Sequence, residues 1–197
     1  MPSPYRYVIV YKPFNVVSAR RDHLGRATLV DVGAPRDLPA AGRLDRDSEG
    51  LLLLTDDGQL LHHITHPDFN HPKTYLVLVL GHPQAEALRL LRGGVETKLG
   101  LTQPAGVEVL QSAPALPPFP QGLPPAEKST WLRMVLYEGK NRQIKRMTAA
   151  VGHPTVRLVR TAIGPLSLPP DLRPGQWRDL TATERRVLLD WVWPHGR

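Results

Sequence analysis

Apolar positions along the chain fall into short runs with two different spacings. Runs that are rich in β-branched residues, or that alternate with polar residues, are typical of strands. Such runs cover residues 6–13, 51–55, 73–81, 105–111, 130–139 and 155–164. The run at 51–55 begins with four consecutive leucines, so we expect this strand to be buried on both faces.

Other segments carry the signals of helices, which are a polar N-cap or a proline in the first turn, a terminating glycine or proline, or an amphipathic pattern. They cover residues 28–33, 56–66, 83–94, 141–152 and 182–193, with Thr28, Asp56 and Asn141 as expected N-caps. Residues 40–50 are charged and glycine-containing, and residues 112–125 hold six prolines, so both are predicted loops. Because strands and helices follow each other without a regular βαβ order, the pattern indicates an α+β fold with a mixed or antiparallel sheet.

Length and composition narrow the class of protein. For 197 residues we expect a single domain, with subdomains at about 1–65 and 66–197 as an alternative division. The absence of cysteine excludes disulfides, thiol catalysis and zinc sites built on thiolates. No apolar run approaches the ~20 residues of a membrane span, and Met1–Arg6 lack a hydrophobic signal segment. We therefore expect a cytoplasmic protein that does not engage a membrane.

The positive charge is concentrated in the second half of the chain. Residues 1–100 carry 12 basic and 11 acidic side chains, whereas residues 101–197 carry 13 and 7, so the net charges are +1 and +6. A basic half favours a polyanionic partner, with nucleic acid as the leading candidate. The alternative is a solvated basic face that only aids solubility.

A charged loop at Gly42–Gly50 leads directly into the leucine strand. This position places its side chains at a strand edge, where clefts form. Arg43 and Arg46 on either side of Asp45 favour an ionised carboxylate, which can act as a nucleophile or an electrostatic stabiliser. The alternative is an ordinary turn with surface ion pairs.

Tyr75 and a basic cluster are the other candidates. Tyr75 stands near the start of a predicted strand, where it could stack on a base or move a proton, or simply be a half-buried strand aromatic. Cations at the start of the helix at 141–152 oppose its dipole, so we expect an anion such as phosphate there, or else a solvated face. The cluster comprises Lys140, Arg142, Lys145 and Arg146, and Arg157 and Arg160 extend it along the next strand.

Four histidines lie within ten positions, at His62, His63, His66 and His71. His62 and His66 have the i, i+4 spacing of a helical metal site. No acidic or cysteine ligand stands at a familiar spacing from them, so we expect surface histidines and no metal.

Several segments, in order, resemble the successive motifs of the RsuA/RluE-type rRNA pseudouridine synthases. They are YKPFNVVS (11–18), GRLDRDSEGLLLLTDDG (42–58), KTY (73–75), EGKNRQIKRM (138–147), VRLVRTAIGPLSL (156–168) and PGQWRDLT (174–181). The residue sequences of these segments are most similar to those of the RluE branch, whose members modify a uridine in 23S rRNA. The resemblance implies an α+β catalytic domain without an S4 domain, in which a mixed sheet forms two halves around a basic cleft.

The same resemblance implies roles for individual residues. Asp45 matches the essential aspartate, Tyr75 the tyrosine that stacks on the target base, and Lys145 the basic residue paired with the aspartate. Arg43 matches the arginine that holds the flipped nucleotide. The apolar motif that shapes the uracil pocket contains Leu158 and Ile163. We expect the remaining basic residues to contact RNA: Arg46, Lys140, Arg142, Arg146, Arg157 and Arg160.

The expected reaction is cofactor-free isomerisation of uridine to pseudouridine in a flipped-out nucleotide. Asp45 would attack the sugar or assist elimination to a glycal, and the sequence leaves both routes open. We expect a monomer acting on 23S rRNA, either free or in a pre-50S particle. A non-catalytic rRNA-binding assembly factor is the alternative, but binding alone does not need Asp45, Tyr75 and Lys145. A nuclease is disfavoured because no acidic cluster beyond Asp45, Asp47 and Glu49 suits a metal.

Overall fold

A computed structural model describes residues 4–196, which form two compact units. Unit 1 comprises Met1–His71 with Arg160–Arg197, and unit 2 is Pro72–Val159. The chain therefore leaves unit 1, builds unit 2 and returns. This division differs from the linear one at about residue 65, because the C-terminal strands and helix complete the sheet and core of the first unit.

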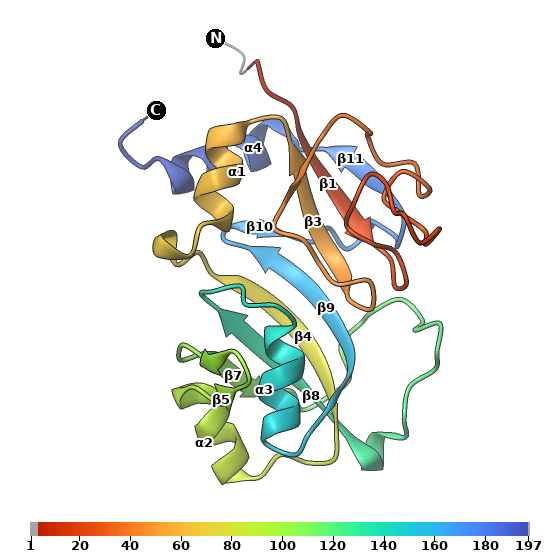
Figure 1. The fold of residues 1–197 in the computed structure, drawn as a ribbon, viewed down its shortest axis with the longest axis vertical. Coiled ribbons are helices and arrows are strands. Elements are labelled where there is room, and N and C mark those ends of the chain that lie inside the picture. Colours follow the sequence, from red (N-terminus) through yellow and green to blue (C-terminus); the bar gives the residue numbers. More distant parts are fainter. Residues whose placement is uncertain (1–3, 197) are drawn as a thin grey trace. The chain divides into compact units, whose positions relative to one another are not determined.

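Unit 1 is a sheet with two helices (Figure 1). Its elements are β1 (Tyr7–Lys12), β2 (Ala40–Ala41), β3 (Glu49–Thr55), α1 (Gly58–Thr65), the 3₁₀ turn Pro67–Phe69, β10 (Leu166–Ser167), β11 (Trp177–Asp179) and α4 (Ala182–Val192). The strand β1 pairs antiparallel with β3 on one side and β11 on the other, with Ile9 opposite Leu53 and Arg178. The β9 strand (Thr155–Ile163) begins in unit 2 and ends in unit 1, where it pairs with β10.

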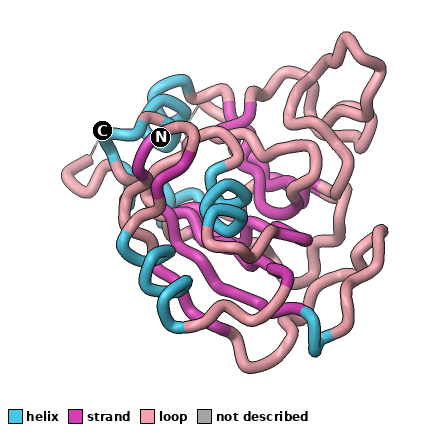
Figure 2. Tube along the Cα trace, turned by 60° about the horizontal axis from the view of Figure 1, so that its bottom comes forward, coloured by secondary structure: helices cyan, strands magenta, loops and turns pink. Residues whose placement is uncertain are grey.

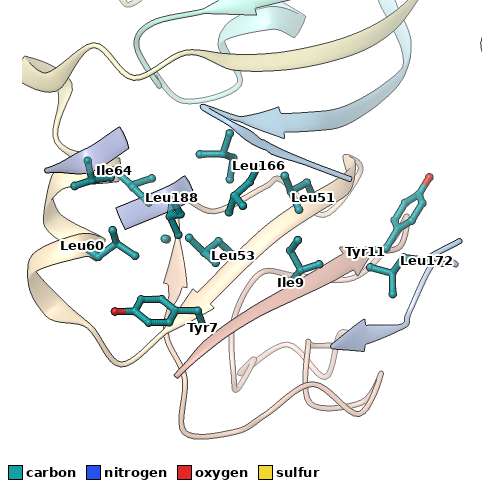
Figure 3. Packing of buried hydrophobic residues seen from close by; sticks show 13 residues of the cluster. Tyr7, Ile9, Tyr11, Leu51, Leu53, Leu60, Ile64, Leu166, Leu172 and Leu188 are labelled. Atoms are coloured by element: carbon teal, nitrogen blue, oxygen red, sulfur yellow. The ribbon is translucent and has the colours of Figure 1, made fainter. Parts of the chain in front are cut away.

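The core of unit 1 lies between this sheet and its helices. Figure 3 shows Leu60 and Ile64 of α1 and Leu188 of α4 among the side chains of β1 and β3, including Leu53. All seven residues of β3 are buried, so the predicted burial of this strand on both faces is confirmed. Alternate residues of a strand point to opposite faces, and the second face of β3 is covered as well.

Unit 2 is built on an antiparallel arrangement of β4 (Lys73–Leu80), β7 (Gly106–Val109) and β8 (Ser129–Leu136), with β9 next to β4 and with two helices. Its other elements are α2 (Ala85–Gly93), β5 (Glu96–Thr97), β6 (Gly100–Leu101), the 3₁₀ turn Ala126–Lys128 and α3 (Gln143–Ala150). The strand β8 pairs with β4 and β7. Val77, Leu132 and Met134 form a core with Leu91 of α2 and Met147 of α3. Among residues 4–196, no helix is both long and apolar enough to cross a membrane.

The structure corrects three local predictions. Residues 28–33 form turns instead of a helix, because the Asp31 carboxylate accepts hydrogen bonds from the backbone and hydroxyl of Thr28. The N-cap of α1 is Asp57, not Asp56, and its side chain accepts a hydrogen bond from the backbone N–H of Leu60. The α3 helix starts at Gln143, preceded by Arg142 rather than by a capping Asn141.

Loops connect many of these elements (Figure 2), and residues 112–125 contain neither helix nor strand, as predicted. The proline-rich loop nevertheless packs on its own unit. Phe119 is buried, and the Arg157 guanidinium lies 5.0 Å from the centre of its ring. A cation over an aromatic face is attracted by the ring quadrupole, so this contact anchors the middle of the loop.

Candidate active site

The segment Gly42–Ser48, hereafter the aspartate loop, connects β2 to β3 in unit 1. Arg43 and Arg46 are exposed, Asp45 is half-buried, and Leu44 is buried. The backbone N–H of Ser48 donates to the carbonyl of Asp45 at 3.1 Å and closes a turn. The loop therefore carries a half-buried aspartate that is flanked in sequence by two exposed arginines.

Buried polar side chains hold the backbone of the aspartate loop. Arg160 donates to the carbonyls of Gly42 at 2.9 Å and of Leu51 at 2.8 Å. Lys12 donates to the carbonyl of Arg46 at 3.3 Å and to that of Pro13 at 2.8 Å. An unpaired backbone carbonyl in a buried position would destabilise the fold, so these charged donors keep the loop in one conformation.

Gly50 permits the close approach of β3 and β9 that brings Arg160 to the loop. Its φ is +107°, and a Cβ atom there would collide with the Arg160 backbone. Glycine is the residue that tolerates both the positive φ and the absence of space.

Arg157 and Arg160, which we expected to extend the basic cluster, are buried in the structure. Each is only 2% exposed. Arg160 uses its guanidinium on backbone carbonyls, and Arg157 lies over Phe119. A buried guanidinium needs internal partners to offset its desolvation, and these contacts provide them.

A second basic surface of unit 1 escaped the sequence analysis. Its exposed arginines line a depression of about 1130 Å³ in the loop between β1 and β2. They are Arg20, Arg21, Arg26 and Arg36. Asp22 and Asp31 are the acidic residues of its lining. Arg26 binds Asp22, and this hydrogen bond holds the pKa of the Asp22 carboxyl well below its ordinary value. Positive charge therefore dominates the depression.

Tyr75 lies on β4 of unit 2, opposite Met134 of β8. It is half-buried and packs against the core of the unit. The β4 strand is paired along its whole length with β8, so the position of the tyrosine is set by regular sheet structure.

The four basic residues around the start of α3 have different surroundings. Lys140 donates to the carbonyl of Leu101 at 2.6 Å and lies 3.5 Å from the Glu138 carboxylate. Arg146 folds back onto Asn141, with its Nε 3.0 Å from the backbone carbonyl. Both cations are therefore engaged within unit 2, which favours a role in shaping this turn.

Arg142 and Lys145 complete the group. Lys145 is half-buried on the first turns of α3. Arg142 is exposed and has a φ of +51°. In residues 4–196 the other non-glycine residues with positive φ are asparagines, which tolerate this region better. A strained backbone at an exposed arginine suggests a functional constraint.

The chain matches the sequence model of a family described as RNA pseudouridylate synthase over residues 6–150. It belongs to the RNA pseudouridylate synthase family. The match includes the aspartate loop, Tyr75 and the start of α3, and it confirms the family expected from the motifs. The chain is therefore a pseudouridine synthase, an isomerase that acts on RNA.

Relatives of this pseudouridine synthase carry a more specific name. Ribosomal large subunit pseudouridine synthase E of Vibrio parahaemolyticus is 48% identical over 182 residues, which cover 89% of this chain and 74% of the relative. The protein of the same name from Xanthomonas axonopodis pv. citri is 51% identical over 163 residues, covering 80% and 85%. These similarities confirm the predicted closeness to the RluE branch.

A crystal structure titled as a pseudouridylate synthase superposes with a TM-score of 0.78 at 32% identity. The superposition covers 93% of this chain and 74% of that one. The predicted α+β pseudouridine synthase fold is thereby confirmed.

The apolar motif of the pseudouridine synthase divides between two cores. Leu158 packs in the core of unit 2, whereas Ile163 is fully buried in the core of unit 1. Both residues lie on β9, five positions apart. Ile163 is the last residue of the strand and Leu158 lies near its middle, so β9 contributes to both cores.

The histidines form an aromatic cluster in unit 1. His63 Nδ1 lies 3.0 Å from His71 Nε2, and its ring stacks on Phe69 with centroids 3.6 Å apart. Burial, with the nearby charge of His62, lowers the pKa of His63. In the part of the chain that the structure describes, no three His, Asp or Glu side chains are grouped to hold a metal ion.

Sequence reasoning also missed two residues that support the aspartate loop, Lys12 and Ser18. Lys12 is fully buried at the end of β1. A lysine that ends a predicted strand next to proline is a weak signal, because most such lysines are exposed. That Lys12 supports the aspartate loop is seen only in the structure, where its ammonium group donates to the carbonyls of Pro13 and Arg46.

Proposed function

We propose that this pseudouridine synthase converts a uridine of 23S rRNA into pseudouridine. The observation that supports this most directly is the half-buried Asp45 on a braced loop between two exposed arginines. The proposal also rests on the relatives named ribosomal large subunit pseudouridine synthase E.

The reaction breaks the bond between sugar C1′ and uracil N1 and forms a bond between C1′ and C5. The hydrogen on C5 is lost to solvent and N1 gains one, so substrate and product are isomers. Because no oxidation state changes overall, the reaction needs neither a redox cofactor nor a nucleotide. The required groups are one that assists at the sugar and one or more that transfer protons.

We assign the first of these roles to Asp45. Its carboxylate would attack C1′ directly or assist elimination to a glycal. Tyr75 would lie against the flipped uracil and take part in proton transfer, and Lys145 would keep the Asp45 carboxylate ionised and oriented. These assignments rest on the order of the motifs and on the local surroundings of each residue.

RNA binding is assigned to the exposed cations. Arg43 would hold the flipped nucleotide, and Arg46 and Arg142 would contact phosphates. The arginines of the depression in unit 1, such as Arg21 and Arg36, would extend this contact along the backbone. Because phosphate contacts release counterions, binding should weaken steeply as salt increases. Lys140 and Arg146 would support the turn that carries Arg142.

We further propose that the enzyme acts as a monomer in the cytoplasm. Either free 23S rRNA or a pre-50S particle would be the substrate, and assays on both RNA forms separate these possibilities.

The decisive experiment maps pseudouridines in 23S rRNA from cells with and without this protein. One uridine should be modified only when the protein is present, and purified enzyme should restore the modification. If no site depends on the protein, the proposed function is wrong.

Asp45→Asn should abolish the restoration, because the amide cannot attack the sugar or accept a proton. The substitution is nearly isosteric, so RNA affinity should change by less than about threefold. Asp68→Asn, at an exposed carboxylate of unit 1, serves as the control. Activity of Asp45→Asn above about a hundredth of wild type would contradict the assignment.

A further inference from the structure

Ser18 is bonded to the residue that precedes Asp45. Its hydroxyl donates to the carbonyl of Leu44 at 2.7 Å and accepts from the N–H of the same residue at 3.0 Å. Ser18 is 8% exposed and Leu44 is 7% exposed. One buried side chain therefore satisfies both backbone groups of the residue between Arg43 and Asp45.

A hydroxyl is well suited to this task. It carries a donor and an acceptor on one atom, so it can bond to an N–H and a carbonyl that face the same way. Without it, two buried backbone groups would lose their partners, each at a cost in free energy. The loop would then move until water or another group replaced the hydroxyl.

Ser18 is itself held on a firm support. The backbone N–H of Val17 donates to Ala27 at 2.9 Å, and Ala19 accepts from the N–H of Leu29 at 3.2 Å. Residues 17 and 28 also form an isolated parallel bridge. The backbone around Ser18 is therefore fixed by hydrogen bonds, and its side chain can hold the aspartate loop in one position.

Three side chains bond to the backbone of the aspartate loop and are called its braces. Along the loop, the positions that they hold alternate with Arg43 and Asp45. Arg160 holds Gly42, Ser18 holds Leu44, and Lys12 holds Arg46. Arg43 and Asp45 lie between the held positions. Ser18 is the brace that adjoins both of them.

We propose that Ser18 is a positioning residue for the reaction, which sets the place of the Asp45 carboxylate through the backbone of Leu44. This inference rests on the proposed function of Asp45. Reaction rates depend steeply on geometry, and a displacement of about 1 Å can cost about a hundredfold in rate. Ser18 affects the chemical step through Leu44, whereas most of the RNA affinity comes from exposed cations that Ser18 does not hold.

Ser18→Ala tests the inference, with Thr55→Val as the matched control. Thr55 is also fully buried in unit 1, and its hydroxyl accepts from the N–H of Asp57 at 3.0 Å, at the opposite end of β3. Both variants lose one buried hydroxyl. Thermal unfolding of each is recorded first. The values of kcat and KM are then measured well below the unfolding temperature, on the form of 23S rRNA, free or in a pre-50S particle, that the wild type modifies.

Ser18→Ala should lower kcat by about tenfold to a hundredfold, with KM within about twofold of wild type. Thr55→Val should keep kcat within about twofold at a similar loss of thermal stability. Ser18→Thr retains the hydroxyl and should keep kcat within about fivefold of wild type. If Ser18→Ala does not fold, Ser18→Cys, whose thiol bonds only weakly, should show the same split between kcat and KM.

Several results would overturn the inference: an unchanged kcat, a change in KM alone, an equal loss in Thr55→Val, or a Ser18→Thr enzyme as slow as Ser18→Ala. These results differ from failure of the proposed function. In that case the wild-type enzyme itself would form no pseudouridine in 23S rRNA.

Discussion

Arginines with similar sequence surroundings occupy very different places in this enzyme. Arg142 is exposed in a left-handed backbone conformation, whereas Arg157 and Arg160 are buried. All three appear in basic stretches of the sequence, and a charge count treats them alike. The two buried guanidinium groups meet internal groups: backbone carbonyls for Arg160 and an aromatic ring for Arg157.

Arg142→Ala should weaken RNA binding while leaving the chemical step nearly unchanged. Removing one phosphate contact should reduce the slope of log affinity against log salt by about one unit. Salt titrations of RNA binding measure this slope. Arg89→Ala is the control, because Arg89 is already paired with Glu86 on α2. Equal slopes for wild type and Arg142→Ala would show that Arg142 binds no phosphate.

At the scale of elements, α4 is held by both a capping box and an ion pair. Thr181 and Glu184 form a capping box, and Arg178 of β11 binds the Glu184 carboxylate at 2.7 and 2.8 Å. The hydrogen bond from Arg178 lowers the pKa of Glu184 from 4.5 to about 2. The helix that returns the chain to the core of unit 1 is thus tied to the sheet by an ion pair.

Glu184→Gln should destabilise the protein by about 1 kcal/mol at pH 7, since it weakens a cap and an ion pair. The pKa of Glu184 is lower in the folded state, so the ionised carboxylate stabilises the fold above about pH 4.5, and this effect disappears as the pH falls toward 2. Unfolding temperatures of both proteins from pH 7 to pH 3 test this. The difference in unfolding temperature between wild type and Glu184→Gln should become smaller below pH 4.5. A difference that stays constant would show that the ion pair does not stabilise the fold. Glu127→Gln, at an exposed carboxylate, should show no such difference.

The proline-rich loop is an element without regular structure that still packs. Replacing residues 112–125 by a short Gly/Ser linker should leave activity on a minimal stem-loop within about tenfold, or roughly 1.4 kcal/mol of barrier. The variant should unfold at a lower temperature, because it loses the buried Phe119. A linker that keeps a phenylalanine at the position of Phe119 is the matched control and should recover part of this loss. A folded variant without turnover would show that the loop builds the active site.

On the scale of the whole molecule, unit 1 is built from an N-terminal and a C-terminal segment of the chain. Residues 160–197 add β10, β11 and α4 to the fold begun by residues 1–71. The strand β9 carries the chain from one unit to the other. Truncation after unit 2 would therefore remove Arg160 from the aspartate loop as well as a core helix.

Removal of metal ions should not change turnover by the intact protein. The reaction as proposed uses a carboxylate, a phenol and an ammonium group, and none of its steps requires a metal. The assay uses a stem-loop that folds without magnesium, in the presence of EDTA. Activity that is lost there and restored by zinc but not by magnesium would contradict the prediction, with His63 and His71 as the first candidates.

Local sequence patterns determined most of the elements and the order of the motifs. The leucine run at 51–55 predicts a doubly buried strand because only such a strand accommodates apolar residues on both faces. The proline density of 112–125 excludes a regular element for a similarly local reason. The ordered motifs, including the one that contains Asp45, indicated the family, because their sequences and spacings can be read along the chain.

Tertiary structure alone decided how the aspartate loop is supported. Its braces come from residues 26, 34 and 118 positions away, at Ser18, Lys12 and Arg160. Hydrogen bonds between residues so far apart in the sequence produce no repeating pattern from which they could be predicted. Each depends on which buried carbonyl lies within reach of a donor after the strands have paired. Burial therefore distinguishes the bracing Arg160 from an exposed arginine such as Arg142, because burial follows from the folded chain and not from the residue type.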